Sequence, residues 1–295
     1  MTATGAANEV RRLSATDVPA VVELLETGFG ATPRGQAGEQ HQFLLDCLDR
    51  GDFACFSAWP AESPVGLLYA NPAGTVVPAG SAAAAPALAE VLQRCDWRIL
   101  IGGLDIGRAL LDTTAPGGLG AGISVFRRRV NVREQRFMSV RDPAVPAALP
   151  RPRGLRRGQS RDLERLTELA CRLHVEDQMG PPLGRAGRAA VRARMQDAVA
   201  RGLSFVVERD GLVVAKVDLS LHSRRRGAQL AGVYVDAAHR GAGIATAAVG
   251  AIAADVLAMG LPVVTLHVRT DNPPARRAYE HAGFADRAGW ILALR

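Results

Sequence analysis

VYVDAAHRGAGIA, residues 233–245, is a short apolar run followed by a loop that leads directly into an alanine-rich segment. Val233, Tyr234 and Val235 suit a strand, and the alanine-rich segment after Gly243 suits a helix. The two glycines of the loop have no side chains that would block a ligand from the backbone N–H groups at the start of that helix. Unpaired N–H groups and the helix dipole both favour negative charge, so this turn suits a pyrophosphate.

A second motif, DNPPARRAYEHAGF at residues 271–284, follows the next strand candidate. Asn272 stands before a helix that the two following prolines can start, and Gly283 stands where that helix ends. Tyr279 lies one helical turn after the small residue Ala275. Taken alone, a tyrosine at such a position is more typical of a helix core than of a catalytic group.

Together the two motifs resemble the GCN5-related N-acetyltransferases, the GNAT family. Residues 240–245 are similar to its acyl-CoA signature, Arg-x-x-Gly-x-Ala after a strand, and residues 272–284 match its Asn-x-x-Ala-x-x-x-Tyr-x-x-x-Gly-Phe segment. The resemblance implies acetyl-CoA as cosubstrate, with the diphosphate on the turn and the pantetheine along the preceding strand. The residues it implies for acetyl-CoA binding are Val233, Tyr234, Val235, Arg240, Gly241, Ala242, Gly243, Ile244, Ala245, Thr246, Asn272, Ala275 and Tyr279.

The resemblance also implies the reaction, a direct attack of a primary amine on the thioester of acetyl-CoA in a ternary complex. The backbone N–H of Val233 is then the donor to the oxyanion, and Tyr279 is the general acid toward the leaving thiolate. The acceptor stays open between a small amine, an antibiotic, a peptide N-terminus and a protein lysine.

The general base is less determined by the sequence. The candidates are Asp218, on the strand candidate 212–219, and Glu176, where the first two helices of the second half meet. Asp218 also suits a solvent-facing strand position. Glu176 and its neighbour Asp177 also suit a cation-binding site or a solvated loop, and His267 also suits a core position.

The chain reads as two halves with the same order of elements. A stretch with four prolines at residues 142–153 separates a first domain, residues 1–141, from a second, residues 154–295, and we expect neither a helix nor a central strand to run through it. We expect an α/β fold with a mixed sheet, built as tandem GNAT-like domains, each a mostly antiparallel central sheet flanked by helices. The expected strands are 10–13, 53–58, 65–70, 204–209, 212–219, 229–235, 263–268, 284–287 and 290–294, and the expected helices include 39–50, 82–93, 188–201, 243–259 and 274–282.

The first half departs from the second where the glycine turn belongs. The helix candidate 82–93 has no Arg-x-x-Gly-x-Gly before it, and only Gly80 stands there. The layout is similar to a two-domain family in which a domain of unknown function precedes a GNAT domain. We therefore expect a first half that keeps the fold and has lost the pyrophosphate site.

Composition narrows the remaining classes of function. Of the 295 residues 48% are hydrophobic, yet there is neither an apolar run long enough for a membrane span nor an evident signal peptide, so the cytoplasm is the expected location. The net charge is +7, and its positive charges are almost all arginine, because Lys216 is the only lysine. Aromatic residues that could stack on bases make up only 5% of the chain, so we expect a solvated basic surface rather than a nucleic-acid partner. The four cysteines and six histidines show no metal-ligand spacing, so no metal is expected.

Two rival interpretations and one open question remain. The GNAT-like turn would also suit a non-catalytic acyl-CoA sensor. Residues 241–246 nearly match the dinucleotide fingerprint G-x-G-x-x-G, but the next strand ends in Arg269 rather than in an acid, and hairpins precede the turn. The oligomeric state stays open between monomer and homodimer.

Overall fold

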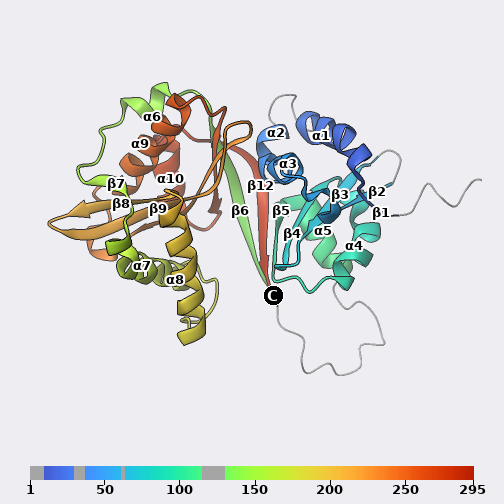
Figure 1. The fold of residues 1–295 in the computed structure, drawn as a ribbon, viewed down its shortest axis with the longest axis horizontal. Coiled ribbons are helices and arrows are strands. Elements are labelled where there is room, and N and C mark those ends of the chain that lie inside the picture. Colours follow the sequence, from blue (N-terminus) through green and yellow to red (C-terminus); the bar gives the residue numbers. More distant parts are fainter. Residues whose placement is uncertain (1–9, 30–36, 61–63, 115–129) are drawn as a thin grey trace, which may run out of the picture. The chain divides into compact units, whose positions relative to one another are not determined.

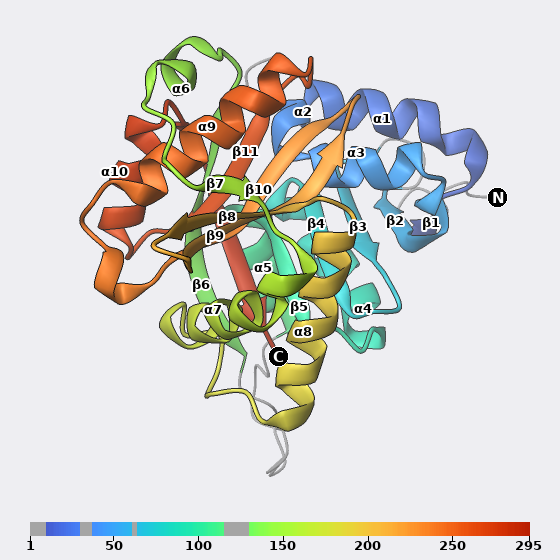
Figure 2. The ribbon, with the colours of Figure 1, turned by 60° about the vertical axis from the view of Figure 1, so that its left-hand side comes forward.

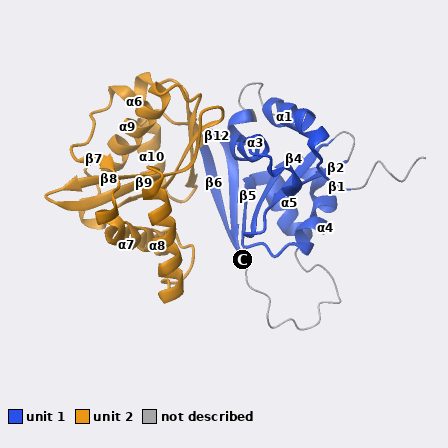
Figure 3. Ribbon diagram, in the orientation of Figure 1, with its two compact units in different colours: residues 1–137, 287–295 blue, residues 138–286 orange. Residues whose placement is uncertain are grey.

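A computed structural model describes residues 10–29, 37–60, 64–114 and 130–295. The chain divides into two compact units, drawn in different colours in Figure 3: unit 1 comprises residues 1–137 and 287–295, and unit 2 comprises residues 138–286. This grouping by packing assigns residues 287–295 to unit 1, whereas the proline-rich boundary in the sequence places them in the second domain.

Unit 1 is a layered α/β unit whose elements are labelled in Figure 1. Its described helices are α1 (Val18–Thr27), α2 (Ala37–Gln40), α3 (Gln42–Asp49), α4 (Ala85–Arg94) and α5 (Leu104–Thr114), with 3-10 turns η2 (Ala15–Asp17), η3 (Asp52–Cys55) and η4 (Ala82–Ala84). Its strands are β1 (Arg11–Arg12), β2 (Phe56–Trp59), β3 (Gly66–Ala70), β4 (Thr75–Gly80), β5 (Ile99–Gly103) and most of β12 (Ala285–Leu294), and β6 (Asn131–Val140) runs from unit 1 into unit 2.

The sheet of unit 1 takes its last strand from the C-terminal end of the chain. The strand order is β1-β2-β3-β4-β5-β12; β4 and β5 are parallel, and β5 and β12 are antiparallel with Leu292 opposite Ile101. Ile291 of β12 is fully buried between the sheet and the helices α4 and α5. A side chain on Gly107 of α5 would approach Ile291 to 2.3 Å, so this glycine allows the helix to lie directly on β12.

Unit 2 holds the motifs singled out in the sequence. Its strands are β7 (Leu155–Arg157), β8 (Ser204–Arg209), β9 (Leu212–Ser223), β10 (Gly227–Val235) and β11 (Val264–Arg269). Its helices are α6 (Ala144–Ala148), α7 (Leu163–Glu176), α8 (Arg185–Ala200), α9 (Ile244–Ala258) and α10 (Pro273–His281), with 3-10 turns η5 (Ser160–Asp162) and η6 (Ala237–His239).

Helices cover both faces of the sheet of unit 2, as the two ribbon views show (Figures 1 and 2). The strand order is β11-β10-β9-β8-β7, antiparallel except for the pair β10 and β11. Leu166 and Leu169 of α7 pack with Val206 on one face, whereas Ile252 of α9 packs with Val207 on the other. The mixed sheet flanked by helices, mostly antiparallel in each unit, confirms the fold class predicted from the sequence.

Two local expectations are wrong, and the proline-rich stretch holds an element that the sequence did not suggest. This stretch contains the short helix α6, which ends at Ala148 and does not run through it; Pro143 is its N-cap and Pro146 lies in its first turn, where a missing N–H has no helical acceptor to lose. The expected helix 39–50 is interrupted at His41, between α2 and α3. The two expected strands 284–287 and 290–294 form the single strand β12, whose pairing with β5 begins at Trp290, just after Gly289.

Other boundaries move by a few residues. Strand β2 begins at Phe56 because residues 52–55 form the 3-10 turn η3. Strand β9 continues to Ser223, beyond the expected end at Leu219. Along the described residues, no helix combines the length and the apolar character that a membrane crossing requires.

His41 is half-buried, with its Nδ1 shielded from solvent, and we expect it to make the stability of unit 1 depend on pH. Burial lowers the pKa of His41 to about 4, whereas the unfolded chain titrates near the ordinary value of about 6.5. Between these values the unfolded state binds the extra proton, so stability falls as the pH decreases. From pH 6.5 to pH 5 we expect a loss of about 1.5 kcal/mol from this group.

Denaturant titrations followed by tryptophan fluorescence can measure this loss, because Trp59, Trp97 and Trp290 all lie in unit 1. The matched variant is His41→Gln, which does not titrate and keeps every carboxylate of the wild type. The variant is expected to lose less stability over this pH range. Equal losses in both proteins would contradict the assignment.

Candidate functional site

The parallel strands β10 and β11 separate partway along their length. Their pairing joins Ala228 to Val264 and ends with Leu230 opposite Leu266. Beyond that point β10 continues to Val235 and pairs with β9 on its other edge, through Tyr234 and Val235. In this part of unit 2 the edge of β10 that faces β11 is therefore open to another extended chain.

A bulge marks the point at which β10 leaves β11. The register with β9 shifts between Ala231 and Tyr234, and Gly232 has a φ of +57°. A side chain at this glycine would also approach the Lys216 Nζ to 2.8 Å and an oxygen of Asp218 to 2.7 Å. Both the backbone conformation and the space therefore require glycine at this position.

The turn after β10 carries a bare helix N-terminus. Gly241 and Gly243 have φ values of +77° and +70°, and a side chain built on either would meet nothing within 4 Å. These glycines are thus required by the backbone conformation. Gly243 is the N-cap of α9 without a side-chain cap, and the helical bonds begin with Ala247 N–H to the Gly243 carbonyl at 3.0 Å. The N–H groups of residues 244–246 precede that first bond and suit an anion.

Helix α7 fixes the start of this turn through Asp236. The Asp236 carboxylate accepts hydrogen bonds from Arg165 at 2.6 Å and Arg172 at 3.0 Å, and it caps η6 by accepting from the Ala238 N–H. The Arg165 guanidinium holds the pKa of the Asp236 carboxyl below its ordinary value, so the carboxylate stays charged at neutral pH. The turn is therefore held in place from the protein side and needs no ligand to position it.

Glu176, the last residue of α7, joins the helix to β10 and to the turn. One carboxylate oxygen accepts from the Tyr234 hydroxyl at 2.5 Å and the other from Arg240 at 2.5 Å. Arg240 also donates to the Val235 carbonyl at 3.0 Å and lies over the Tyr234 ring. The Arg240 side chain is thus tied to Glu176 and to β10, although 47% of it remains exposed.

Helix α10 begins at a capped end and carries one buried phenol. The Asn272 side chain accepts from the Ala275 N–H at 3.2 Å and so starts the helix. Tyr279 is 7% exposed and packs against Phe284. Burial, with a smaller contribution from the Asp177 charge, raises the pKa of Tyr279 above the ordinary value of about 10. At neutral pH the hydroxyl is therefore a stable proton donor.

His267 of β11 is neutral under the same conditions. Its Nδ1 lies 3.0 Å from the Gln229 amide nitrogen. Burial lowers the pKa of His267 to about 3. A group this weakly basic is a poor acceptor for the proton of an amine, so the structure gives His267 the properties of a core residue.

The two base candidates have different surroundings. The Asp218 side chain is 13% exposed; it accepts from Lys216 at 2.5 Å and from the Ser204 hydroxyl at 2.8 Å. The Glu176 side chain is 43% exposed, at the end of α7. Asp218 therefore belongs to an interior polar group, whereas Glu176 is accessible from solvent.

Most of the predicted residues are placed by three elements of unit 2. The first set lies on one segment, residues 233–246, which comprises the end of β10, the turn and the first turn of α9. Ala275 and Tyr279 lie on α10, and Asn272 is its N-cap. The sequence motifs do not identify Asp236, Arg165 and Lys216 as residues that shape this region. For Lys216 a signal existed, because a single lysine in an arginine-rich chain stands two residues from Asp218 on one strand.

Unit 1 has the same layout without the turn. Ser81 caps η4 by accepting from the Ala83 N–H at 3.2 Å, as Asp236 caps η6 in unit 2. Pro78 stands three residues before the cap Ser81, as Val233 stands three residues before the cap Asp236. Pro78 therefore occupies the position of Val233, but it has no N–H to donate. A side chain on Gly102 of β5 would approach the Pro78 carbonyl to 2.8 Å, so the two strands lie close together there. Helix α4 follows η4 directly, whereas residues 240–243 separate η6 from α9.

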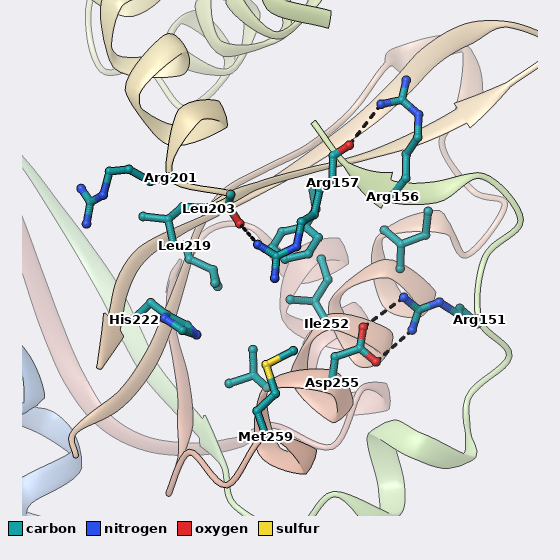
Figure 4. Close-up of a pocket in the computed structure, with 14 residues that line it drawn as sticks. Arg151, Arg156, Arg157, Arg201, Leu203, Leu219, His222, Ile252, Asp255 and Met259 are labelled. Atoms are coloured by element: carbon teal, nitrogen blue, oxygen red, sulfur yellow. Dashed lines mark hydrogen bonds and ion pairs between the residues drawn. The ribbon is translucent and has the colours of Figure 1, made fainter. Parts of the chain in front are cut away.

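A cavity of about 200 Å³ lies at the other end of α9 (Figure 4). Apolar side chains such as Phe205 and Ile252 line it together with arginines. Arg151 pairs with Asp255 through two bonds of 3.0 Å, and Arg157 donates to the Gly202 carbonyl just after α8. These guanidinium groups serve the fold, so the cavity does not define a second anion site.

No group of three or more potential metal ligands occurs among the residues that the structure describes.

Comparison with known proteins bears on this region directly. Residues 165–284 match the model of the acetyltransferase (GNAT) family, a range that contains β10, the turn, α9 and α10. No curated protein matches the chain.

Solved structures resemble nearly the whole chain. A GCN5-related N-acetyltransferase from Sphaerobacter thermophilus is 18% identical, covers 97% of this chain and 94% of its own, and gives a TM-score of 0.59. A GNAT-family acetyltransferase from Colwellia psychrerythraea is 12% identical, with 97% and 98% covered and a TM-score of 0.54. A tandem GNAT protein from the clavulanic acid biosynthesis pathway is 14% identical, with 97% and 98% covered and a TM-score of 0.55.

At these identities the structures establish the fold alone, and the family model carries the assignment. The resemblance to the GNAT family predicted from the two sequence motifs is confirmed, and so is the tandem fold. Residues 165–284, which lie in unit 2, therefore form a domain of the acetyltransferase (GNAT) family.

Proposed function

We propose that the protein is an acetyl-CoA-dependent N-acetyltransferase whose unit 2 transfers an acetyl group to a primary amine. The observation that carries the proposal is the bare N-terminus of α9 directly after the open edge of β10, with the protonated Tyr279 on α10. An anion site and an open strand edge together fit a ligand with a diphosphate and an amide-bearing arm.

Three sets of residues hold acetyl-CoA in this proposal. The backbone of residues 240–246 receives the diphosphate, which the uncapped N–H groups and the dipole of α9 stabilise. The open edge at Val233 and Val235 hydrogen-bonds the pantetheine amides. Asn272 and the small Ala275 border the arm from α10.

The reaction is a direct transfer. The acceptor nitrogen forms a bond to the thioester carbonyl carbon, the carbon–sulfur bond breaks, and the nitrogen loses one proton. The backbone N–H of Val233 stabilises the oxyanion. Tyr279 donates its proton to the leaving sulfur and regains one when the acceptor nitrogen is deprotonated.

The two carboxylates receive different roles in this proposal. We assign contact with the acceptor to Glu176, because its side chain is 43% exposed. It attracts a cationic amine and takes the ammonium proton before the attack, whereas the second proton, which the nitrogen loses after the attack, restores Tyr279. Asp218, at 13% exposure and held by Lys216 and Ser204, supports the site from within. The acceptor is thus a small amine or a peptide or protein amine with access to the end of α7.

Isothermal calorimetry with CoA and a thiol-release assay with a panel of amines test the function together. We expect one CoA per chain, because Pro78 and the direct step from η4 to α4 deprive unit 1 of a comparable site. We also expect thiol release that depends on an added amine. Two equivalent sites would refute the assignment to unit 2 alone.

The rival function is a sensor that binds acyl-CoA without turnover. The buried, protonated Tyr279 favours the enzyme, since binding alone does not require a proton donor beside the thioester. Tight CoA binding without thiol release across small amines, peptides and proteins would favour the sensor, and absence of CoA binding would refute both.

A further inference from the structure

Lys216 is the only lysine of the chain and is among its most buried charged groups. It is 1% exposed, on β9 beside the bulge of β10. Its Nζ donates to Asp218 at 2.5 Å and to the Gly232 carbonyl at 2.8 Å. Because an ammonium is expensive to remove from water, its presence here calls for a use that an apolar residue cannot fulfil.

The bond to Gly232 fixes the orientation of one peptide group. The Gly232 carbonyl and the Val233 N–H belong to the same peptide unit, and the only cis peptide within the described ranges is Trp59–Pro60. In a planar trans peptide the carbonyl and the N–H point in opposite directions. A carbonyl held on Lys216 therefore directs the Val233 N–H away from the ammonium.

We propose that Lys216 is a positioning residue that aims the Val233 N–H into the opening between β10 and β11. The inference rests on the proposed function, in which that N–H stabilises the oxyanion. The ammonium also polarises the peptide unit that it holds, which strengthens its N–H as a donor. Asp218, fixed by Ser204, keeps the ammonium beneath the bulge.

The chemistry of the site explains why this position is lysine rather than arginine. The ammonium is a compact point charge with three donors, whereas a guanidinium is a wide planar fork. A side chain on Gly232 would already approach the Lys216 Nζ to 2.8 Å, so the space beneath the bulge is narrow. A compact cation fits there, and a planar fork would displace the strand.

The double variant Lys216→Met/Asp218→Asn tests the inference. It removes both buried charges together and leaves no unpaired charge, so it is the variant most compatible with folding. We expect kcat to fall about 30-fold or more, in the range that loss of an oxyanion donor produces. The Kd for CoA is expected to change less than about threefold, because the diphosphate is held elsewhere.

The matched control is Arg151→Met/Asp255→Asn, which removes an ion pair at the far end of α9. Its kcat is expected to equal that of the wild type. A rescue variant, Lys216→Gln/Asp218→Asn, retains an N–H that can donate to the Gly232 carbonyl and is expected to recover part of the lost kcat relative to methionine.

A direct readout separates this inference from the proposed function. The amide proton chemical shift of Val233 can be measured by NMR on labelled protein without substrate. It is expected to change in Lys216→Met/Asp218→Asn and to stay at the wild-type value in Arg151→Met/Asp255→Asn. An unchanged shift with unchanged kcat would overturn the positioning role while the enzyme stands. A wild type that neither binds CoA nor releases thiol would overturn the function first.

Discussion

Replacing Tyr279 by phenylalanine is expected to lower turnover about 100-fold to 10,000-fold, the range that a general acid contributes. The ring packs against Phe284 in the core of unit 2, and the variant retains this contact, so the fold is expected to persist. The Kd for CoA is expected to stay within about threefold of the wild type, since the hydroxyl acts on the leaving sulfur only in the transition state. Steady-state kinetics with calorimetry measures both quantities.

The control for this prediction is Tyr69→Phe in unit 1. Tyr69 is 4% exposed and packs against Phe56, so the variant also removes a hydroxyl from a buried ring. It is expected to retain full turnover. The raised pKa of Tyr279 adds a second test: the wild type should show no loss of activity from phenol ionisation near pH 10, the ordinary value. Turnover unaffected by Tyr279→Phe would remove this residue from the mechanism.

The second large effect is expected at Gly243. Valine cannot easily adopt its φ of +70°, so Gly243→Val would turn the first N–H groups of α9 away from their common direction. A hydrogen bond to a charged group contributes about 1.5–3 kcal/mol. Loss of one or two such bonds is expected to raise the Kd for CoA by about 10-fold to 1,000-fold.

Gly260 provides a matched control within the same part of the chain. It follows the other end of α9, has a φ of +84°, and a side chain at this position would likewise meet nothing within 4 Å. Gly260→Val therefore introduces the same kind of backbone strain without touching the proposed diphosphate site. Calorimetry should show weakened CoA binding for Gly243→Val alone, and equal weakening in both variants would indicate a general loss of fold.

The sequence predicts those features that depend on neighbours along the chain. The strand before residue 236, the glycine turn and α9 form one continuous segment, so local patterns suffice to place them. The same holds for Asn272, Ala275 and Tyr279, which one short helix carries. Alternation along β9 also predicts correctly that Asp218 lies on the face opposite Val217 and Leu219.

Features that depend on packing between distant segments could not be predicted from the local sequence patterns. Asp218 accepts from Ser204 on β8, and Lys216 reaches the Gly232 carbonyl on β10, so neither role follows from the pattern of β9 alone. Leu149, the residue after α6, packs against Gly250 of α9, where a side chain on that glycine would approach it to 2.6 Å, and this contact is equally invisible in the local pattern. The partner of β12 is equally distant, since β5 lies far earlier in the chain.

The pairing of β12 with β5 has a consequence for folding during synthesis of the protein. The residues around Ile101 emerge from the ribosome long before Leu292, which lies opposite Ile101 in the sheet, is added to the chain. The sheet of unit 1 therefore lacks the β12 neighbour of β5 until the whole of unit 2 has been synthesised. Truncations that remove β12 are therefore expected to damage unit 1, most of which is translated before unit 2, and chaperones that bind exposed strand edges would find their substrate there.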